Sequence, residues 1–260
     1  MNLILSTTVL SFLLFVGVLV DQETNTIKRI DSNYRISKSM SDFYKLEALV
    51  QKFIKVFPKS DRIFWRMGRT YFKLGEKSNA KSEKARYFLL CIEYSGKTLK
   101  INPMSAHGYF FNGLCNGSLG QVQGLWSSLG KIKPFKKDME TAISIDPSVN
   151  EGGPHRALAN LYLQLPFFLG GDLDRSIIHF KEAVRLGPEF GENYLGLAEA
   201  YIQNEDFLLA RETLQAILEI KPGTQKDESI SEWHTEASSS LQKIAGQIDS
   251  ESYAKRIKNK

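Results

Sequence analysis

Two arginines lie where their side chains could bind a carboxylate group. Arg69 follows Trp65 by four residues and precedes Phe72 by three, so all three share one face of an α-helix. Arg156 has a similar position further along the chain, and a guanidinium among apolar side chains can hold a carboxylate through two parallel hydrogen bonds. We therefore expect a site for a small organic-acid or amphipathic ligand. The alternative is that the arginines are solvated or pair with acidic residues of the chain, such as Glu199.

The other residue types that carry chemistry do not form a catalytic or metal site. The four histidines are scattered without metal-ligand spacing, and no nucleophile motif or phosphate-binding glycine loop stands beside an expected strand. We expect no enzyme, no metal site and no cofactor. His155 is interpreted as a polar core or helix-end residue. Cys91 and Cys115, on neighbouring expected helices, could form a disulfide in an oxidising compartment, although their apolar settings favour free thiols.

Composition describes a globular chain with one sizeable core. Of the 260 residues, 42% are hydrophobic and 24% are charged. The net charge is +5, but the 34 basic and 29 acidic side chains are mostly interspersed, without a basic stripe and interleaved aromatics. We therefore expect no nucleic-acid partner. The densest basic run lies within residues 249–260 and is interpreted as a solvated tail.

The N-terminus indicates export. Residues 3–20 carry no charge. This uncharged stretch is just long enough to span a bilayer core as a helix. Neither a basic start nor a small-residue cleavage site is convincing, so residues 1–20 are expected to be either a signal peptide or an N-terminal anchor. Residues 21–40 are polar and weakly periodic, and are interpreted as a tether. We expect a periplasmic protein that an uncleaved N-terminal segment could hold at a membrane.

Prolines divide the rest of the chain into helical units. Helical runs end at Pro58, Pro103, Pro147, Pro188 and Pro222, and the last two are 34 residues apart. This is the period of the tetratricopeptide repeat, a helix pair closed by a proline. The unit that begins at Gly191 fills eight positions of the repeat pattern without a gap. The sequence therefore predicts an all-α, tetratricopeptide-like superhelix of helical hairpins over residues 41–248, in which the last helix, from Asp227 to about Ile248, caps the stack.

The repeat register also predicts which residues face the concave inner wall. They lie at the second, fifth, ninth and twelfth positions of each first helix, and are mostly aromatic and aliphatic with a few polar groups, as in small-molecule sites. The predicted ligand-binding residues are Trp65, Arg69, Phe72, Phe110, Leu114, Gly117, Arg156, Asn160, Leu163, Leu195 and Glu199.

Two stretches depart from the plain repeat. Glycines at positions 113, 117, 120 and 124 share one face of an extended helix, and we favour close approach of another helix over an open lumen as the reason. The insertion from Leu165 to Gly171 places Phe167 and Phe168 in a loop. There they either pack into the core, which we favour, or contact a partner, and they are the candidate partner-binding residues.

Residues 100–222 resemble the T-component family of tripartite ATP-independent periplasmic (TRAP) transporters. The resemblance rests on the block ending IDPSVNEGGPHRALANLY, on the aromatic insertion QLPFFLGGDLDRSI and on FKEAVRLGPEFGENYLGLAEAY. It implies a soluble periplasmic repeat protein that accompanies a substrate-binding P-component and has a ligand-accessible cavity through the repeat stack. The chain departs from several members in having no lipidation cysteine near its N-terminus.

The expected function is therefore an accessory role in TRAP-type solute uptake. The chain would bind a small organic-acid or amphipathic ligand in its repeat cavity and dock the P-component. Its aromatic and glycine surfaces are also compatible with a homo-oligomer. The alternative is a generic repeat scaffold for protein–protein interaction, including one similar to eukaryotic regulators of microtubule dynamics, which share this repeat style and often a membrane-anchored N-terminus.

Overall fold

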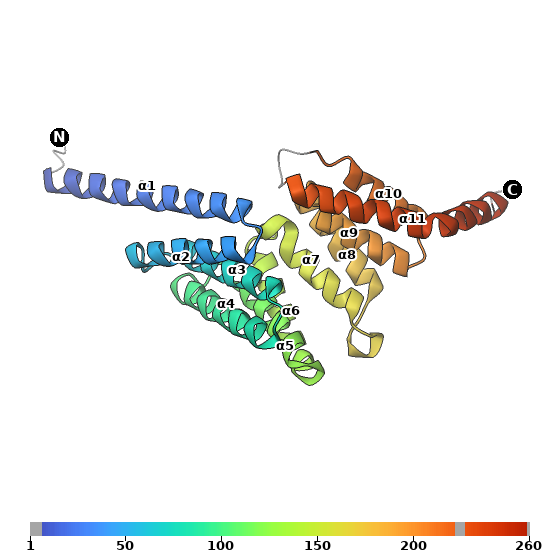
Figure 1. Cartoon of the computed structure of the whole chain (residues 1–260), viewed down its shortest axis with the longest axis horizontal. Helices are drawn as coiled ribbons and strands as arrows, with labels where there is room; N and C mark the ends of the chain where they lie inside the picture. Colours follow the sequence, from blue (N-terminus) through green and yellow to red (C-terminus); the bar gives the residue numbers. More distant parts are fainter. Residues whose placement is uncertain (1–6, 222–226, 259–260) are drawn as a thin grey trace, which may run out of the picture.

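The chain is built from helices. The computed structural model describes residues 7–221 and 227–258, and these ranges contain eleven α-helices, one 3-10 helix and no β-strand (Figure 1). The elements are α1 (Thr7–Ile36), α2 (Met40–Val56), α3 (Asp61–Lys77), α4 (Lys81–Ile101), α5 (Ala106–Gln123), α6 (Leu125–Ile145), α7 (Val149–Gln164), η1 (Phe167–Leu169), α8 (Leu173–Leu186), α9 (Gly191–Gln203), α10 (Phe207–Leu218) and α11 (Asp227–Lys258). The prediction of an all-α fold is confirmed.

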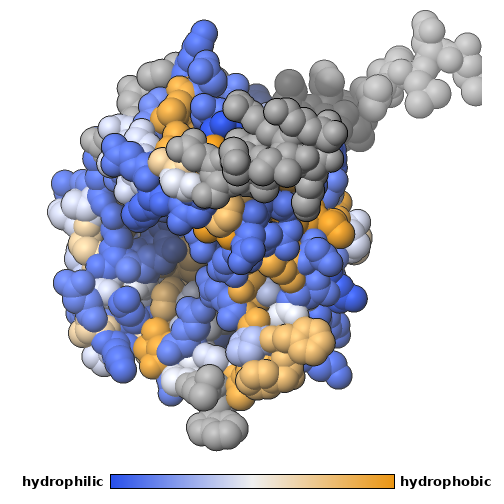
Figure 2. Space-filling model, turned by 90° about the vertical axis from the view of Figure 1, so that its right-hand side faces the viewer, coloured by the Kyte–Doolittle hydropathy of each residue, from blue (hydrophilic) through white to orange (hydrophobic). Residues whose placement is uncertain are grey.

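Consecutive helices pair into hairpins that stack in chain order. α3 pairs with α4, α5 with α6, α7 with α8 and α9 with α10, while α3, α5, α7 and α9 contact one another in turn and form the inner layer. α11 covers the last hairpin by packing on α10 and α9, so the tetratricopeptide-like superhelix with a C-terminal capping helix is confirmed. Four of the five prolines lie in or at the turns that follow even-numbered helices, and Pro222 lies outside the described residues. At the C-terminal end of the molecule the surface is mainly hydrophilic, with scattered hydrophobic side chains around a hollow (Figure 2).

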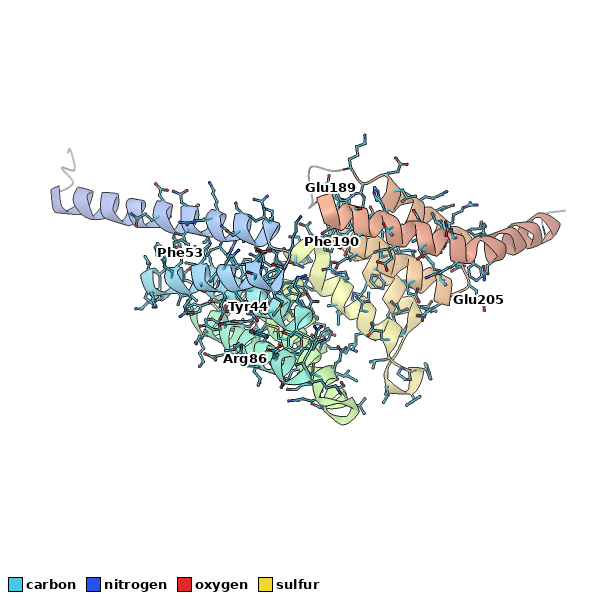
Figure 3. The ribbon with its side chains drawn as sticks, viewed as in Figure 1. Tyr44, Phe53, Arg86, Glu189, Phe190 and Glu205 are labelled. Carbon is cyan, nitrogen blue, oxygen red and sulfur yellow. A yellow bond between two sulfur atoms is a disulfide. The ribbon has the colours of Figure 1, made fainter. Side chains whose placement is uncertain are left out.

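The segment expected to be a polar tether, residues 21–40, is largely helical. Residues up to Ile36 form the second half of α1, which packs on α2 and α3. Ile27 and Ile30 are buried, and the Arg29 guanidinium lies 5.8 Å from the ring centroid of Phe53, which Figure 3 labels beside α2. The segment did not look periodic because few of its positions contact the core and the others are polar.

The two chain ends are described only in part. In the apolar segment of residues 3–20, the backbone is described from Thr7 on, as the first half of α1, and side chains are described only from Val20. Within the described residues, no helix combines the length and the apolar character needed to cross a membrane. The choice between signal peptide and anchor for residues 1–20 stays a prediction. At the other end α11 continues to Lys258, so the backbone of most of the expected basic tail is helical.

The buried side chains form two hydrophobic clusters that meet at α7. The first cluster extends from α1 to α7, and the second extends from α7 to α11. The neighbouring residues Leu158 and Ala159 belong to different clusters because they point to different sides of α7. α7 therefore joins the two halves of the molecule, which Figure 1 shows on either side of it.

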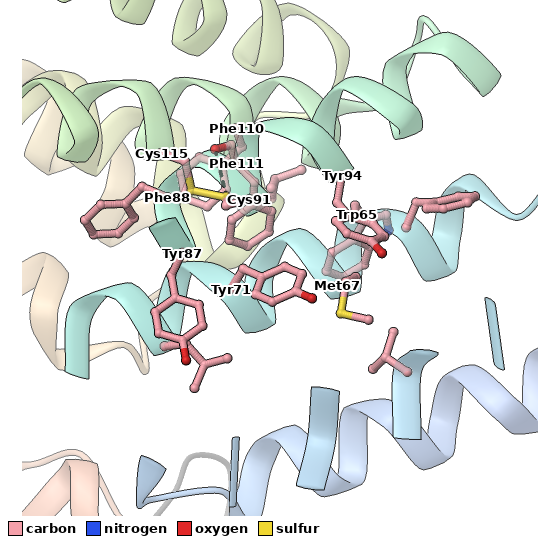
Figure 4. Close-up of a cluster of buried hydrophobic side chains, with 14 of the residues drawn as sticks. Trp65, Met67, Tyr71, Tyr87, Phe88, Cys91, Tyr94, Phe110, Phe111 and Cys115 are labelled. Carbon is pink, nitrogen blue, oxygen red and sulfur yellow. Dashed lines mark hydrogen bonds between the residues drawn. A yellow bond between two sulfur atoms is a disulfide. The ribbon is translucent and has the colours of Figure 1, made fainter. Parts of the chain in front are cut away.

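A disulfide lies inside the first cluster. Cys91 of α4 and Cys115 of α5 are bonded, and both are fully buried (Figure 4). The ring of Phe88, one turn before Cys91, belongs to the same cluster. The favoured expectation of free thiols is wrong, because the packing of α4 on α5 brings the two sulfur atoms together.

The glycine stripe of α5 allows close packing of α6. A Cβ atom at Gly113 would overlap Met139, and one at Gly117 would lie 3.1 Å from the ring of Phe135. Gly124 has a φ of 107°, a conformation that L-residues rarely adopt, and it marks the break between α5 and α6. Close approach of another helix is therefore confirmed as the reason for Gly113, Gly117 and Gly120, whereas a Cβ atom at Gly124 would have no neighbouring atom within 4 Å.

Candidate functional site

The first half of the expected ligand wall is filled by aromatic packing. The Trp65 ring stacks on the ring of His107 at 4.0 Å and on that of Phe111 at 6.0 Å between centroids. Phe110 is only 1% exposed, and Phe72 is half-buried, with its ring centroid 6.4 Å from that of Phe111. In Figure 4 the rings of Trp65, Phe110 and Phe111 lie within the buried cluster. The structure thus places these residues in a packed core rather than around an open cavity.

His107 takes part in this cluster as a neutral ring. Burial, together with the positive charges of Arg66 and Arg69, lowers the pKa of His107 to about 4. At neutral pH the imidazole is therefore uncharged, which suits its stacking on Trp65.

Arg69 holds a carboxylate, but this carboxylate belongs to Asp31 of α1. Arg69 Nη2 lies 2.7 Å from Asp31 Oδ1, and Arg66 binds both oxygens through Nε at 2.9 Å and Nη2 at 2.6 Å. The Arg69 guanidinium also lies 3.7 Å from the ring centroid of Tyr34. Burial alone would raise the pKa of Asp31, but hydrogen bonds and charges from Arg66 and Arg69 outweigh burial and lower it. A residue of the chain itself therefore occupies the position expected for a ligand carboxylate.

Arg156 links α7 to the start of α9. Its Nη1 donates a hydrogen bond to Asn193 Oδ1 at 2.8 Å, and its Nε lies 3.7 Å from Glu192 Oε2. The guanidinium also lies 4.6 Å from the ring centroid of Phe190, which Figure 3 labels near α7 and α11. The side chain is only 12% exposed, and burial lowers the pKa of Arg156 against the opposing charge of Glu192. The second expected carboxylate-binding arginine is thus also engaged by the chain.

Asn193 is the centre of this link, and the sequence reasoning missed it. Its fully buried amide donates hydrogen bonds to the backbone oxygens of Glu151 at 2.9 Å, Ala183 at 2.8 Å and Gly187 at 3.2 Å. Two of these carbonyls lie at the end of α8, and the third belongs to the non-helical first turn of α7. A single asparagine therefore satisfies backbone groups from two elements, while its Oδ1 accepts from Arg156.

The Gly-Gly-Pro-His-Arg motif forms the turn that this network holds. Gly152 has a φ of 73°, and a Cβ atom there would lie 2.9 Å from Ala183 of α8. A Cβ atom at Gly153 would lie 2.7 Å from the ring of Phe110. Only residues without a side chain fit both places, and Pro154 then begins the regular part of α7.

His155 faces His179 across the α7–α8 hairpin. Their Nδ1 atoms are 2.9 Å apart, and the ring of Tyr162 stacks on His179 at 5.7 Å. Burial lowers the pKa of His155, and burial with the charge of His155 lowers that of His179 to about 4. Two neutral rings can share one hydrogen bond. In the part of the chain that the structure describes, no group of three metal-ligating side chains could hold an ion.

The remaining expected ligand residues lie together in an open groove. Asn160 and Leu163 of α7 and Leu195 and Glu199 of α9 line a groove of about 530 Å³, and α11 forms its other wall. The other lining residues are Gln164, Gly196, Ala198, Ile202, Gln203, Leu214, Glu236 and Ser240. A second hollow of about 590 Å³ continues along α11 and shares Glu199, Glu236 and Ser240 with the first. We call the first of these the inner groove.

Phe167 and Phe168 project from the molecule on η1. Their side chains are 91% and 82% exposed, so the favoured expectation of core packing is wrong. The loop closes on itself through a hydrogen bond from Gly171 N to Pro166 O at 3.0 Å, and a Cβ atom at Gly171 would overlap the backbone of Leu165. This tight closure leaves the two rings outside. Their role in partner binding stays a proposal.

The predicted single cavity is therefore divided. Trp65, Arg69, Phe72 and Phe110 lie in a packed region, Leu114 is half-buried beside the first cluster, and Gly117 lies against α6. Arg156 braces two helices, and the four residues that follow it in the predicted set line the inner groove. Asp31 and Glu236 were missed because one lies in the segment interpreted as a tether and the other in the capping helix.

Two family descriptions match different halves of the chain. The family described as "Regulator of microtubule dynamics protein 1-3" matches residues 26–151, and the family described as "TRAP transporter T-component" matches residues 120–232. The resemblance to the T-component is thus confirmed over residues 120–232. This range contains α7 and α9, which supply most of the lining of the inner groove, whereas Glu236 and Ser240 of α11 lie beyond it.

Individual relatives are distant. The chain is 22% identical over 185 residues to regulator of microtubule dynamics protein 1 of Bos taurus, with 65% of this chain and 58% of that protein covered. The match thus spans less than two thirds of that relative's length. Among solved structures, a thermophilic tetratricopeptide protein of Thermus thermophilus is similar at 18% identity, with 82% of this chain and 98% of that chain covered and a TM-score of 0.62. This likeness shows the fold.

Proposed function

We propose that the chain is a non-enzymatic, exported adaptor that binds a segment of a partner protein in the inner groove. The observation that carries this proposal is the contrast between the two halves of the inner layer. Between α7, α9 and α11 the wall is open and lined by side chains from these helices and from α10, whereas near α3 and α5 it is filled by aromatic rings and by Asp31. Stacked repeats commonly use such inner surfaces to bind partners.

The lining of the inner groove suits a protein segment better than a small organic acid. Small-molecule sites are mostly apolar with few polar groups, but this groove presents several amide, hydroxyl and carboxylate groups above a partly apolar floor. It also continues into the neighbouring hollow along α11. An extended segment could place backbone groups against the amides and side chains on the floor along this length.

The disulfide supports export. Disulfides between buried cysteines persist in secreted or periplasmic proteins and are rare in the reducing cytosol. Cys91 and Cys115 are bonded in the core of the first cluster, and the uncharged stretch of residues 3–20 is a feature of exported chains. Both features agree with the periplasmic location that the T-component resemblance implies.

A TRAP-type role is the second candidate function. It is favoured by the match of residues 120–232 to the T-component description, since these residues include α7 and α9, which supply most of the groove lining. In this role the partner would be the substrate-binding P-component. The organic-acid ligand expected from Arg69 and Arg156 receives less support, because both guanidinium groups are engaged by residues of the chain.

Site-specific photo-crosslinking tests the proposal. A benzoylphenylalanine would replace Gln203, an exposed groove residue, or Leu89, an exposed residue on α4 far from the groove. Crosslinking would be tested in cells and, for the TRAP role, with purified P-component. We expect a discrete adduct from position 203 that Ser240→Trp abolishes, because the new indole fills the groove. Adducts that form equally from position 89, or that survive Ser240→Trp, would contradict binding in the groove.

A further inference from the structure

We infer that the inner groove selects partner segments that carry positive charge, namely a lysine- or arginine-containing stretch with apolar residues beside its cations. The inference rests on the proposed function and specifies the class of partner. Two carboxylates carry it. Glu199 lines the groove from α9 and Glu236 lines it from α11, so negative charge is present on two of its walls.

These groove carboxylates lack the cationic partners that Asp31 and Glu192 have. Asp31 is paired with two arginines, and Glu192 lies 3.7 Å from Arg156. Neither Glu199 nor Glu236 forms an ion pair with another described residue, and Glu199 accepts only a 3.2 Å hydrogen bond from Gln203. The inner groove therefore offers negative charge that the fold itself does not neutralise.

The neighbouring hollow extends this acidic surface. Glu232 adds a third carboxylate there, beside the shared Glu199 and Glu236, and Lys243 is the cation of its described lining. Like charges on facing walls repel, and a cation placed between them relieves that repulsion. An organic anion would instead be repelled by these carboxylates, which argues against the organic-acid ligand expected from the sequence.

The apolar part of the groove defines the rest of the partner. Leu163 of α7 and Leu195 and Ile202 of α9 are half-buried on its floor. Such a floor can contact aliphatic side chains and also the methylene stem of lysine or arginine, whose charged end then reaches a carboxylate. Gln164 and Gln203 can pair with the backbone of an extended segment. A cation without apolar groups would contact the carboxylates but not the apolar floor.

Peptide selection on the full-length chain tests the inference. A random dodecapeptide display library would be selected on immobilised protein, and the enriched peptides would be measured by fluorescence anisotropy. We expect lysine and arginine beside aliphatic residues in peptides whose binding Ser240→Trp abolishes. The matched control is Ser238→Trp, because Ser238 is exposed on α11 but lines neither the groove nor the hollow beside it.

A double variant that removes charge but keeps side-chain size tests the contribution of the two carboxylates. Glu199→Gln with Glu236→Gln keeps the side-chain size and removes two negative charges, and we expect it to weaken the selected peptides by about tenfold or more. Glu212→Gln with Glu219→Gln removes the same charge from exposed sites outside the groove and should leave affinity nearly unchanged. Raising the salt concentration to about 0.5 M should weaken binding to the wild type more than to the groove variant.

The outcomes separate this inference from the proposed function. Neutral or acidic peptides that still require the groove, or basic peptides unaffected by the two groove substitutions, would overturn the inference and leave groove binding intact. Peptides whose binding is indifferent to Ser240→Trp, or the absence of any enriched peptide, would overturn the proposed function and the inference with it.

Discussion

Arg156 and Asn193 form a 2.8 Å hydrogen bond that joins the inner helices α7 and α9. At the other end of the inner layer, Arg69 and Asp31 join α3 to α1 at 2.7 Å. Both arginines occupy positions that suit ligand binding, yet each is held by a partner on a neighbouring helix. The inner layer is therefore braced by guanidinium groups, and the open groove lies between α7, α9 and α11.

Removing Arg156 should destabilise the protein. Arg156→Ala would leave the buried Asn193 Oδ1 without its donor and Glu192 without its cation, at a cost of about 1–3 kcal/mol in the free energy of unfolding. Urea denaturation measures this change. Arg175→Ala, which removes an exposed surface pair with Asp172, is the control and should leave stability unchanged. If Arg156→Ala is as stable as the wild type but no longer binds the partner, Arg156 binds a ligand and does not brace the fold.

Asp31 should hold α1 on the fold. Asp31→Ala leaves Arg66 and Arg69 facing each other without the shared carboxylate, so we expect about 1–3 kcal/mol less stability and faster proteolysis within α1. Asp21→Ala, at an exposed position of the same helix, is the control. Because folding lowers the pKa of Asp31 below its ordinary value of 3.8, the wild type should lose this contribution only as the pH falls below that value. Equal proteolysis of both variants would contradict a bracing role.

Two histidines should make stability depend on pH. The pKa values of His107 and His179 are about 4 in the folded chain, against an ordinary value of 6.5. Between these values the unfolded chain binds more protons, so stability is complete above about pH 6.5 and declines as the pH falls toward 4. Melting temperatures between pH 7 and pH 4.5 measure this decline, and His179→Gln should reduce its slope. A slope that is the same in the variant would show that His179 does not contribute to the pH dependence of stability.

The buried disulfide should contribute to stability. It closes a loop between residues 24 apart in sequence, for which loop-closure entropy gives about 3 kcal/mol. We expect a lower urea midpoint for the double variant Cys91→Ala/Cys115→Ala, and a similar lowering of the wild type when it is fully reduced. Reductant should not affect the double variant. A wild type that is shown by mass spectrometry to be reduced, yet has an unchanged midpoint, would contradict this contribution.

The exposed phenylalanines should be dispensable for folding. Phe167→Ser with Phe168→Ser removes side chains that contact little of the fold, and we expect a change within about 0.5 kcal/mol. Phe180→Ala provides the contrast, since Phe180 is fully buried and its truncation should cost about 3–5 kcal/mol. Calorimetry compares the two. A large loss of stability in the double variant would show that the loop packs against the fold in solution.

The repeat architecture could be predicted because its signals are local. Prolines end the helices, and small or apolar residues recur at helical spacing, so hairpins and inner positions follow from short stretches of sequence. The second half of α1 could not be predicted in this way. Its buried positions, Ile27 and Ile30, are few and stand among polar residues, so helical burial there depends on α2 and α3.

The site was predicted only in part, because side-chain partners are long-range. Leu195 and Glu199 were placed on the groove wall from repeat register alone. The partner of Arg69 lies 38 residues away, and that of Arg156 lies 37 residues away, and no local pattern marks either pairing. The disulfide is similar, since burial in an apolar helix is equally compatible with free thiols until the packing of α4 on α5 is known.

Hydrogen–deuterium exchange of the full chain with and without a bound partner tests the central claim most directly. The partner can be a groove-dependent peptide from the selection or a purified P-component. We predict that binding slows exchange in residues 157–164 of α7, 195–203 of α9 and 231–243 of α11, which surround the inner groove. Protection confined to α1, α3 and α5, with no change in these three segments, would contradict the assignment of binding to the inner groove.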